Sequence, residues 1–463
     1  IRLIRMEEAG RQLQQALDMA TASGNDLQKI TALLGFSFLH TTQGALANGQ
    51  QYANEAIAYA EQRGLETIIG RGLNELGLAY WASGDYDEAE KHFKQSLDYA
   101  RRNKVRLREA FSLMNLGGLA IHRLRTEEGL GYVKEALAFF QQAGYRTYVS
   151  ICLTSLGRAL RHQGDYEAAL QAFQQKLQLA RETNDQTQIA FSYGDMGTVL
   201  GEQERFPEAL ARYDESYQIN RSLGSRVSIT YNLLNRGNVL WRIGRYDEAR
   251  EALKQASTLA SQPDGSYKPV LAEVSLREAE MALSERRLGE ARAAAEQALK
   301  QASTPGGKDF IYKDVAVQAK YTRGLSQAFS GATGEARRSC EEAVEMAKNA
   351  GDAALLSRAL LALAEALLED GDSQGALARA LEAQERLARA GQLESEWRAW
   401  LLAARASRNK GDNLAARNQL ERAANILSQL EQKWGQAVFS IYLTRPDIRS
   451  LHKQLGVTLP ADS

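Results

Sequence analysis

The stretch Asn74-Glu75-Leu76-Gly77-Leu78-Ala79-Tyr80, followed by the turn Gly84-Asp85-Tyr86, decides the fold of this chain. Its glycine recurs every 40 residues, in the series Gly77, Gly117, Gly157, Gly197 and Gly237. Twelve residues after each of these glycines stands another small residue, in the series Ala89, Gly129, Ala169, Ala209 and Ala249. A fixed period of this length is the sequence signature of a repeat protein, in which a small structural unit is stacked many times.

Each repeat is predicted to hold two amphipathic helices. Helix A carries the recurring glycine, and helix B carries the small residue and then an apolar stripe at intervals of three and four, as in Ala89, Phe93, Leu97 and Ala100. The small residues in both helices allow the two to approach closely. Glycine at the end of helix B accepts the left-handed cap conformation, and it stands at Gly64, Gly144 and Gly224, with Lys104 as an exception.

The pattern continues more weakly towards both ends of the chain. Later register positions hold small residues, at Ala279, Gly324, Ala364 and Ala404, and two longer steps fall on the proline-containing segments 262–269 and 304–309. We count about ten antiparallel helix pairs after a lone helix B over residues 3–22. The sequence therefore predicts an all-α chain with a regular array over 1–262, an alanine-rich degenerate array over 263–432, and a capping segment with a short helix over 433–463.

These columns resemble the tetratricopeptide repeat, in the 40-residue variety found in spindle-orientation adaptors, kinesin light chains and bacterial sensor proteins. The resemblance is strong over residues 66–262, although the turn aromatic is absent at 126–129. It implies a right-handed superhelical solenoid whose concave groove, lined by helix A, binds a peptide or a helix of a partner protein.

Composition limits the other functions that the chain could have. Lysine plus arginine and aspartate plus glutamate are both 57, so no net charge attracts the chain to nucleic acid or to an anionic membrane. No run of about 18 apolar residues is present to span a membrane. The two cysteines, Cys152 and Cys340, form neither a disulfide framework nor a zinc site, which suits a reducing, cytoplasmic location.

No group of residues indicates an enzyme, a metal or a cofactor. His122 and His162 stand one repeat apart, and a helix-packing distance of about 8–10 Å is too long for joint metal ligation. The stretch Gly306-Gly307-Lys308 lacks the first glycine and the hydroxyl residue of a phosphate-binding loop. We therefore predict a chain without catalytic activity.

The family pattern implies which helix A positions line the groove: six, three and two residues before the recurring glycine, and one, four and five after it. Read onto this sequence, these columns give the candidate peptide-binding residues Asn115, His122, Arg158, Arg161, His162, Asp195, Asn235, Asn238, Trp241 and Arg242. Asparagine is a poor residue inside a helix, and its amide can both donate to and accept from a peptide backbone. Solvated polar positions, or links between repeats, are the competing interpretation.

Four of these candidates suggest the chemistry of the partner. His122, Arg158, Arg161 and His162 are expected to form a local basic cluster, which suits an acidic or C-terminal peptide segment. A solvated face is the alternative interpretation. Trp241 stands where sister repeats have small residues, and aromatic side chains are typical anchors at binding hot spots.

Two functions remain open at this stage. The first is a scaffold that binds a protein or peptide partner. The second is the sensor or autoinhibitory arm of a larger bacterial protein, with a peptidase, kinase or DNA-binding effector domain outside this chain. The lone first helix B favours a piece of a longer protein, whereas the capping segment argues against an effector immediately downstream. Self-association through the alanine-rich half also stays open.

Overall fold

The computed structural model describes residues 2–262, 268–303 and 310–457. Within these ranges the chain forms 23 helices, and its sole β-type pairing is an isolated bridge between Ser303 and Phe310. The helices that carry the A pattern are α2 (Asp26–Gln43), α4 (Glu66–Ser83), α6 (Arg106–His122), α8 (Arg146–Gln163), α10 (Gln186–Glu202), α12 (Arg226–Arg242), α14 (Lys268–Ser284), α16 (Lys313–Phe329), α18 (Ala353–Glu369) and α20 (Leu393–Asn409).

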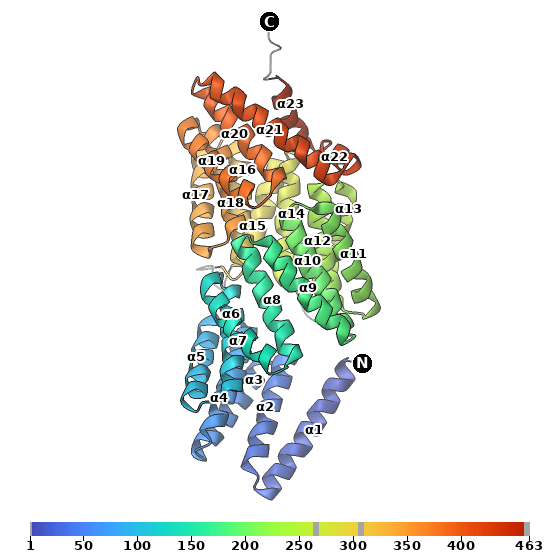
Figure 1. The fold of residues 1–463 in the computed structure, drawn as a ribbon, viewed down its shortest axis with the longest axis vertical. Helices are drawn as coiled ribbons and strands as arrows, with labels where there is room; N and C mark the ends of the chain where they lie inside the picture. Colours follow the sequence, from blue (N-terminus) through green and yellow to red (C-terminus); the bar gives the residue numbers. More distant parts are fainter. Residues whose placement is uncertain (1, 263–267, 304–309, 458–463) are drawn as a thin grey trace. The chain divides into compact units, whose positions relative to one another are not determined.

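A helix of the B type follows each of these, after one unpaired helix at the start. These helices are α1 (Arg2–Ser23), α3 (Leu46–Gln62), α5 (Tyr86–Arg102), α7 (Thr126–Gln142), α9 (Tyr166–Glu182), α11 (Phe206–Ser222), α13 (Tyr246–Ala260), α15 (Leu288–Ala302), α17 (Thr333–Ala350), α19 (Ser373–Arg389) and α21 (Asn413–Trp434). Two short helices, α22 (Gln436–Tyr442) and α23 (Pro446–Val457), end the described chain. The prediction of ten helix pairs is confirmed (Figure 1).

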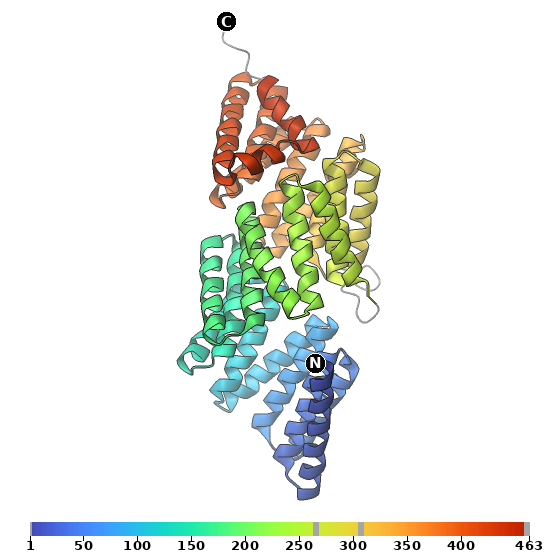
Figure 2. The same cartoon turned by 90° about the vertical axis from the view of Figure 1, so that its right-hand side faces the viewer.

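The chain divides into two compact units, which we describe separately as unit 1 (Ile1–Ala159) and unit 2 (Leu160–Ser463). In each unit a helix packs mainly against its neighbours in sequence, and helices A of successive repeats also touch one another. Figure 2 shows this stacking of helical hairpins within each unit. The predicted subdivision at residues 262 and 432 concerns the regularity of the repeats and stays a prediction.

The recurring glycines are places where helix A and helix B approach too closely for a side chain. A Cβ atom built on Gly77 would lie 2.6 Å from the ring of Phe93, and one on Gly197 would lie 2.8 Å from Tyr213. The small residue of helix B faces the same contact, and Ala89 is fully buried. The glycine columns therefore encode helix packing, as the sequence predicted.

The turns between helices also follow the sequence. Asp85 caps α5, because its side chain accepts a hydrogen bond from the backbone N–H of Glu88. Gly64 ends α3 with a φ of 65°, in the left-handed region that glycine accepts without strain. Lys104 occupies the same place in the next repeat with a φ of 55°, so a lysine there carries backbone strain.

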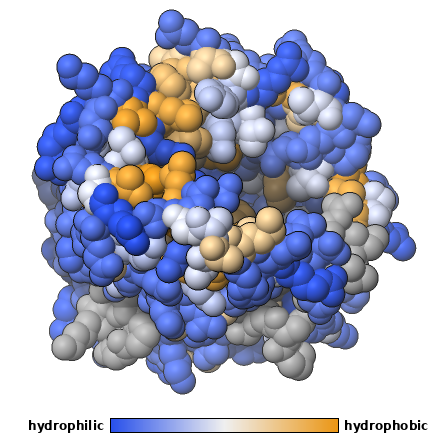
Figure 3. Space-filling view, turned by 90° about the horizontal axis from the view of Figure 1, so that it is seen from below, coloured by the Kyte–Doolittle hydropathy of each residue, from blue (hydrophilic) through white to orange (hydrophobic). Residues whose placement is uncertain are grey.

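Apolar packing is organised differently in the two units. In unit 1, a core cluster around Ile30, Leu33 and Leu73 joins the first repeats. Outside the core, the face of the molecule seen from below in Figure 3 is largely hydrophilic, and its hydrophobic patches are separate from one another. In unit 2 one large cluster unites side chains of α9–α12 with those of α20–α23, including Phe206 and Trp434. Segments about 230 residues apart in sequence thus share one core.

Helix α23 packs on α20 and α21, and its predicted role as a cap of the array stays a prediction. Its Ile448 and the preceding Tyr442 are fully buried in the large cluster of unit 2. Among the described residues, no helix is both long and apolar enough to cross a membrane.

Candidate functional site

Three of the sequence-predicted groove residues lie in unit 1. Asn115 is buried, and its amide donates to Asn74 Oδ1 at 2.9 Å, which links α6 to α4. His122 lies 3.0 Å from the Tyr86 hydroxyl, with ring-to-ring contact to the same tyrosine. Arg158 is exposed on α8. Asn115 therefore acts as a link between repeats, which was the competing interpretation for the asparagines.

Three further candidates in unit 2 are engaged inside the protein. Arg161 forms an ion pair with Glu202 of the next repeat, and its guanidinium also lies 2.9 Å from His162 Nε2. Asp195 accepts a hydrogen bond from the buried Lys176 at 2.9 Å. The positive charge of Arg161 is thus balanced within the chain.

The predicted basic cluster therefore does not act as four free cations. His122 and Arg158 belong to unit 1, whereas Arg161 and His162 belong to unit 2. His162 is buried, and Arg161 is paired. Whether any of these residues contacts an acidic segment stays a prediction.

Helix α12 carries the four remaining candidates. Asn235 and Asn238 are half-buried and stand three residues apart, on one helical face. The Oδ1 atom of Asn238 is buried and accepts no hydrogen bond from the described residues. Trp241 is 9% exposed, and Arg242 forms ion pairs with two carboxylates described below. The asparagine pair is thus the part of the predicted groove that remains unengaged by the described chain.

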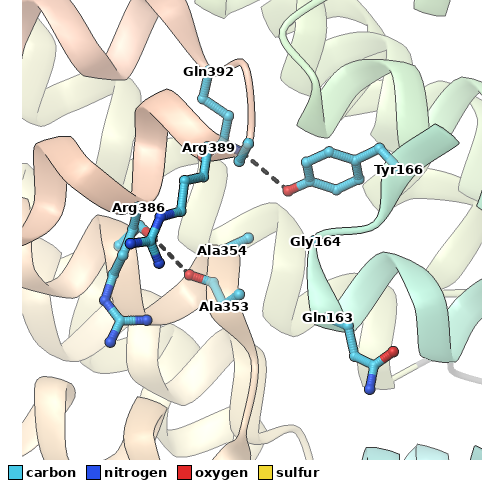
Figure 4. A pocket seen from close by; sticks show the side chains of 10 residues that line it. Gln163, Gly164, Tyr166, Ala353, Ala354, Arg386, Arg389 and Gln392 are labelled. Carbon is cyan, nitrogen blue, oxygen red and sulfur yellow. Dashed lines mark hydrogen bonds between the residues drawn. The ribbon is translucent and has the colours of Figure 1, made fainter.

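Unit 2 also contains an open cleft of about 200 Å³ that the sequence did not indicate. One wall is the turn between α8 and α9, the second is the start of α18, and the third is the end of α19 (Figure 4). The lining residues are Gln163, Gly164, Tyr166, Ala353, Ala354, Ser357, Arg386, Arg389, Ala390 and Gln392. Across the cleft, Gln392 donates to the Tyr166 hydroxyl at 3.2 Å, which fixes the distance between two walls.

Two arginines give the cleft its charge. Arg389 is exposed and pairs with Glu385 on its own helix. Arg386 is half-buried, and its guanidinium forms no hydrogen bond or ion pair with the described residues. An unpaired guanidinium in a cleft favours an anionic group, because it offers N–H donors and positive potential.

The ionisable groups behind this cleft are buried together. Burial and the nearby Glu202 raise the pKa of Asp352 to about 6, although its carboxylate still caps α18 by accepting from Leu355 N at 2.9 Å. Burial also raises the pKa of Tyr166. For Arg358, burial alone would lower the pKa, but Tyr321 and the acidic groups raise it. Arg358 therefore stays charged here, and the Asp352 carboxylate takes up a proton more easily than a solvent-exposed aspartate does.

A second charged site joins distant repeats of unit 2. Glu204 lies in the turn between α10 and α11, and its buried carboxylate accepts the backbone N–H of Glu394 at 2.5 Å and the Ser395 hydroxyl at 2.7 Å. It thus caps the first turn of α20. Burial and the neighbouring Glu394 raise the pKa of Glu204. Burial alone would do the same to Glu394, but Arg242, Arg398 and Arg445 lower its pKa to about 2.

The same turn is held from a third side by the end of α21. The Trp434 indole donates to the Glu204 carbonyl oxygen at 2.6 Å and packs on Phe206 at a ring distance of 5.0 Å. Lys433 donates to the Gln203 carbonyl oxygen at 2.9 Å. Unit 2 is therefore closed on itself by polar contacts between the α10–α11 turn and the last two repeat helices.

Neither cysteine is available for chemistry at a groove or cleft. Cys152 and Cys340 are free thiols that are fully buried, and burial raises the pKa of each to about 12. In the described part of the chain, no three histidine, cysteine or acidic side chains are grouped as metal ligands.

A family comparison identifies the repeat. Overlapping matches to the tetratricopeptide repeat model cover residues 69–142, 108–182, 150–222 and 226–303, which together make up half of the chain. The chain belongs to the tetratricopeptide repeat family. A second model, described as anaphase-promoting complex subunit 5, matches residues 4–69 and 320–369. No curated protein matches this tetratricopeptide repeat chain.

Solved structures that are similar to this chain include those of three other proteins. The apo form of RapI is 15% identical, with a TM-score of 0.42 over 59% of this chain and 99% of that chain. A Rap protein complexed with competence and sporulation factor is 15% identical, with a TM-score of 0.43 over 93% and 98%. The apo form of the quorum sensor NprR from B. thuringiensis is 11% identical, with a TM-score of 0.49 over 80% and 99%.

Several residues of these sites had no signal in the tetratricopeptide pattern. Arg386, Arg389 and Gln392 lie at the end of α19 and just beyond it, outside the groove columns. Glu204 did carry a signal, because it stands where sister turns have Gly84, Gly164 and Gly244. A charged residue with a φ of 57° at a glycine position indicates a side chain that is needed for its contacts.

Proposed function

We propose that this chain is a protein-interaction scaffold that binds an extended peptide segment of a partner on the A-helix face of α12. The observation that carries this proposal is the pair Asn235 and Asn238. The Oδ1 atom of Asn238 is buried without a donor among the described residues, and such an atom costs about 1–3 kcal/mol if it stays unsatisfied. A turn of the Asn238 side chain towards the groove would bring this oxygen within reach of a backbone N–H of a bound peptide, which would satisfy it.

We further propose that the bound segment is acidic or ends in a free carboxylate. The cleft of unit 2 supports this, because Arg386 is unpaired among the described residues and Arg389 stands one helical turn away. A carboxylate can accept two N–H bonds from one guanidinium, which favours it over a neutral side chain. Within unit 2, the candidates Arg161, His162, Asp195, Trp241 and Arg242 stay part of the proposed groove. The candidates Asn115, His122 and Arg158 stay proposed peptide contacts of unit 1 by itself. No catalytic step belongs to this function.

The same peptide contact would serve the alternative function, in which the chain is the sensor arm of a larger bacterial protein. In that case peptide binding would change the activity of a linked effector domain. In a scaffold, binding would bring two proteins together and change no linked activity.

An array of synthetic 12-residue peptides with graded net charge tests the binding function, followed by fluorescence anisotropy on the tightest peptide. Asn235→Ala/Asn238→Ala and Arg386→Glu/Arg389→Glu should each weaken binding about tenfold or more, since lost hydrogen bonds to charged or buried groups cost about 1.5–3 kcal/mol. Arg292→Glu, at an exposed site on α15, is the matched control and should leave affinity unchanged. Equal binding by all four proteins would contradict both proposed contacts.

A further inference from the structure

The link between α22 and α23 contacts the end of α12 that carries the predicted groove residues Trp241 and Arg242. Arg445 lies over the indole ring of Trp241, with 4.7 Å between the guanidinium carbon and the ring centroid. It also donates to the Arg242 carbonyl oxygen at 2.7 Å. The Arg445 side chain is only 2% exposed, so this contact is sealed from solvent. Part of the A-helix face of α12 is therefore covered by the chain itself.

Close backbone packing supports the same contact. A Cβ atom on Gly244, in the turn after α12, would lie 2.7 Å from the Ile441 carbonyl oxygen. Tyr442 is fully buried, and its ring packs on Trp434 at 5.2 Å in an edge-on geometry. Helix α22 thus fits against this turn at a distance that only glycine permits.

The segment is connected to the repeats by a joint that can act as a hinge. Gly435, between α21 and α22, has φ 77° and ψ 153°, a backbone conformation that is nearly restricted to glycine. A Cβ atom at this position would meet nothing within 4 Å, so the glycine is not explained by crowding. Arg445 keeps its ion pair with Asp447 at 2.8 Å within the segment. Release would therefore break the contacts to Trp241 and Arg242 and expose the buried Tyr442 and Ile448, while Arg445 would keep its ion pair.

We propose that residues 436–457 form a clasp, which covers the Trp241 and Arg242 end of the α12 surface and inhibits the binding of a partner peptide there. This inhibition rests on the proposed peptide-binding function. The clasp itself is an intramolecular contact, and it can be tested without any partner. Opening at Gly435 would expose Trp241 together with the side chains that now cover it.

The clasp is tested first by hydrogen–deuterium exchange on the full chain. Arg445→Met removes the hydrogen bond to the Arg242 carbonyl oxygen and the positive charge that stacks on the Trp241 ring. It keeps most of the buried side-chain volume. It should speed amide exchange in residues 436–457 and 243–245 about tenfold or more relative to the remaining helices of unit 2. Asp447→Asn is a milder second variant, and Arg449→Met, at an exposed position of the same helix, is the matched control. Control-level exchange in both Arg445→Met and Asp447→Asn would overturn the clasp.

Inhibition is tested with a fluorescent synthetic peptide of residues 436–457 added in trans. Arg445→Met should bind this peptide at least tenfold more tightly than the wild-type chain does, and a further Trp241→Ala should abolish the gain. Failure of the opened variant to bind the peptide would overturn the role of α12 as the clasp's docking surface.

The array peptide that binds best then separates the two proposals. Tighter binding to Arg445→Met than to the wild type supports inhibition by the clasp. Equal binding to both, with faster exchange in the variant, overturns inhibition and leaves the proposed function intact. Absence of array binding to either protein overturns inhibition and the proposed function together.

Discussion

Arg242 of α12 bridges two carboxylates that are 190 residues apart in sequence, Glu204 and Glu394. Its guanidinium lies 3.3 Å from Glu204 Oε1 and 3.0 Å from Glu394 Oε2. Both carboxylate side chains are at most 2% exposed. Glu204 and Glu394 therefore share one arginine of α12, and Glu394 has a second ion-pair partner in Arg398 at 3.5 Å.

Removal of this arginine should strongly destabilise unit 2. Arg242→Ala would leave Glu204 and Glu394 close together without their shared cation, and breaking a buried ion pair costs about 3–5 kcal/mol. Urea unfolding followed by tryptophan fluorescence would measure the change, because Trp241, Trp397, Trp400 and Trp434 all lie in unit 2. Arg212→Ala, which removes an exposed pair with Glu215, should cost under about 1 kcal/mol. Similar losses for both variants would contradict the role of the bridge.

Unit 2 should lose stability as the pH rises from 5 to 8. Burial and the neighbouring Asp314 raise the pKa of Glu273 to about 7, against a partial opposing effect of Arg277 and Arg161. Between the unperturbed value of 4.5 and about 7, the folded state binds more protons than the unfolded state, so the unfolding free energy falls with rising pH. The raised pKa of Asp352 likewise makes the unfolding free energy fall as the pH rises. The lowered pKa of Glu394 changes the unfolding free energy only below pH 4.5, outside this range.

The variant Glu273→Gln tests this pH dependence. It should lose less stability than the wild type between pH 5 and pH 8, by roughly 1–3 kcal/mol, since one unit of pKa shift corresponds to about 1.4 kcal/mol. Urea midpoints at the two pH values give the comparison. Glu421→Gln, an exposed carboxylate on α21, should follow the wild-type curve. An unchanged difference between the two pH values in Glu273→Gln would show that Glu273 does not set the slope.

Strain at the end of helix α5 should be removable. Lys104→Gly places glycine where sister repeats have it, at a φ of 55°, and should stabilise unit 1 by about 1 kcal/mol because left-handed backbone costs about 1–2 kcal/mol in other residues. Helix content followed during urea unfolding would detect the gain. Glu204→Gly, at a φ of 57°, should instead destabilise unit 2, because it removes the cap of α20. Stabilisation by both substitutions would mean that the Glu204 carboxylate contributes little.

Some helical glycines lie at a close contact between helices, and others have open space around them. Replacement by alanine should have opposite effects on stability at these two kinds of position. Gly77→Ala should destabilise unit 1 by about 1–3 kcal/mol, because the new methyl group would lie 2.6 Å from Phe93 and 3.2 Å from the Ala89 carbonyl oxygen. Gly131→Ala meets nothing within 4 Å and should stabilise α7 by about 0.5–1 kcal/mol. Thermal melting of both variants against the wild type measures the difference. A neutral Gly77→Ala would indicate that α4 and α5 can separate without cost.

The fold could be predicted because its packing is local. Gly77 and Phe93 meet within one repeat, so the same contact leaves a mark every 40 residues. The turn glycines and the caps at Asp85 and Gly64 are also local to one repeat, so they too recur in the sequence and could be predicted from it. Even the pair Arg161–Glu202 could have been anticipated, since these residues stand at neighbouring groove columns of successive repeats.

The closure of unit 2 could not be predicted in this way. Whether Glu204 reaches Glu394 depends on the small rotation that each repeat adds, accumulated over several repeats, and no single repeat shows it in its sequence. The same holds for Gln392 and Tyr166, which meet across the cleft. The groove positions were therefore assigned without knowledge of which ones the chain itself engages.

Closure also limits how this half of the protein can change in length. Three turns spaced 40 residues apart meet later parts of the chain: Gly164 lies against Ala353, Glu204 against Glu394, and Gly244 against Ile441. Duplication or loss of one repeat between α13 and α18 would shift every one of these partners to a different angle around the superhelix. An open array tolerates such changes because each repeat depends only on its neighbours. The three turn contacts of unit 2 require a set number of repeats between them. Homologous chains should therefore differ in length outside this part of the protein.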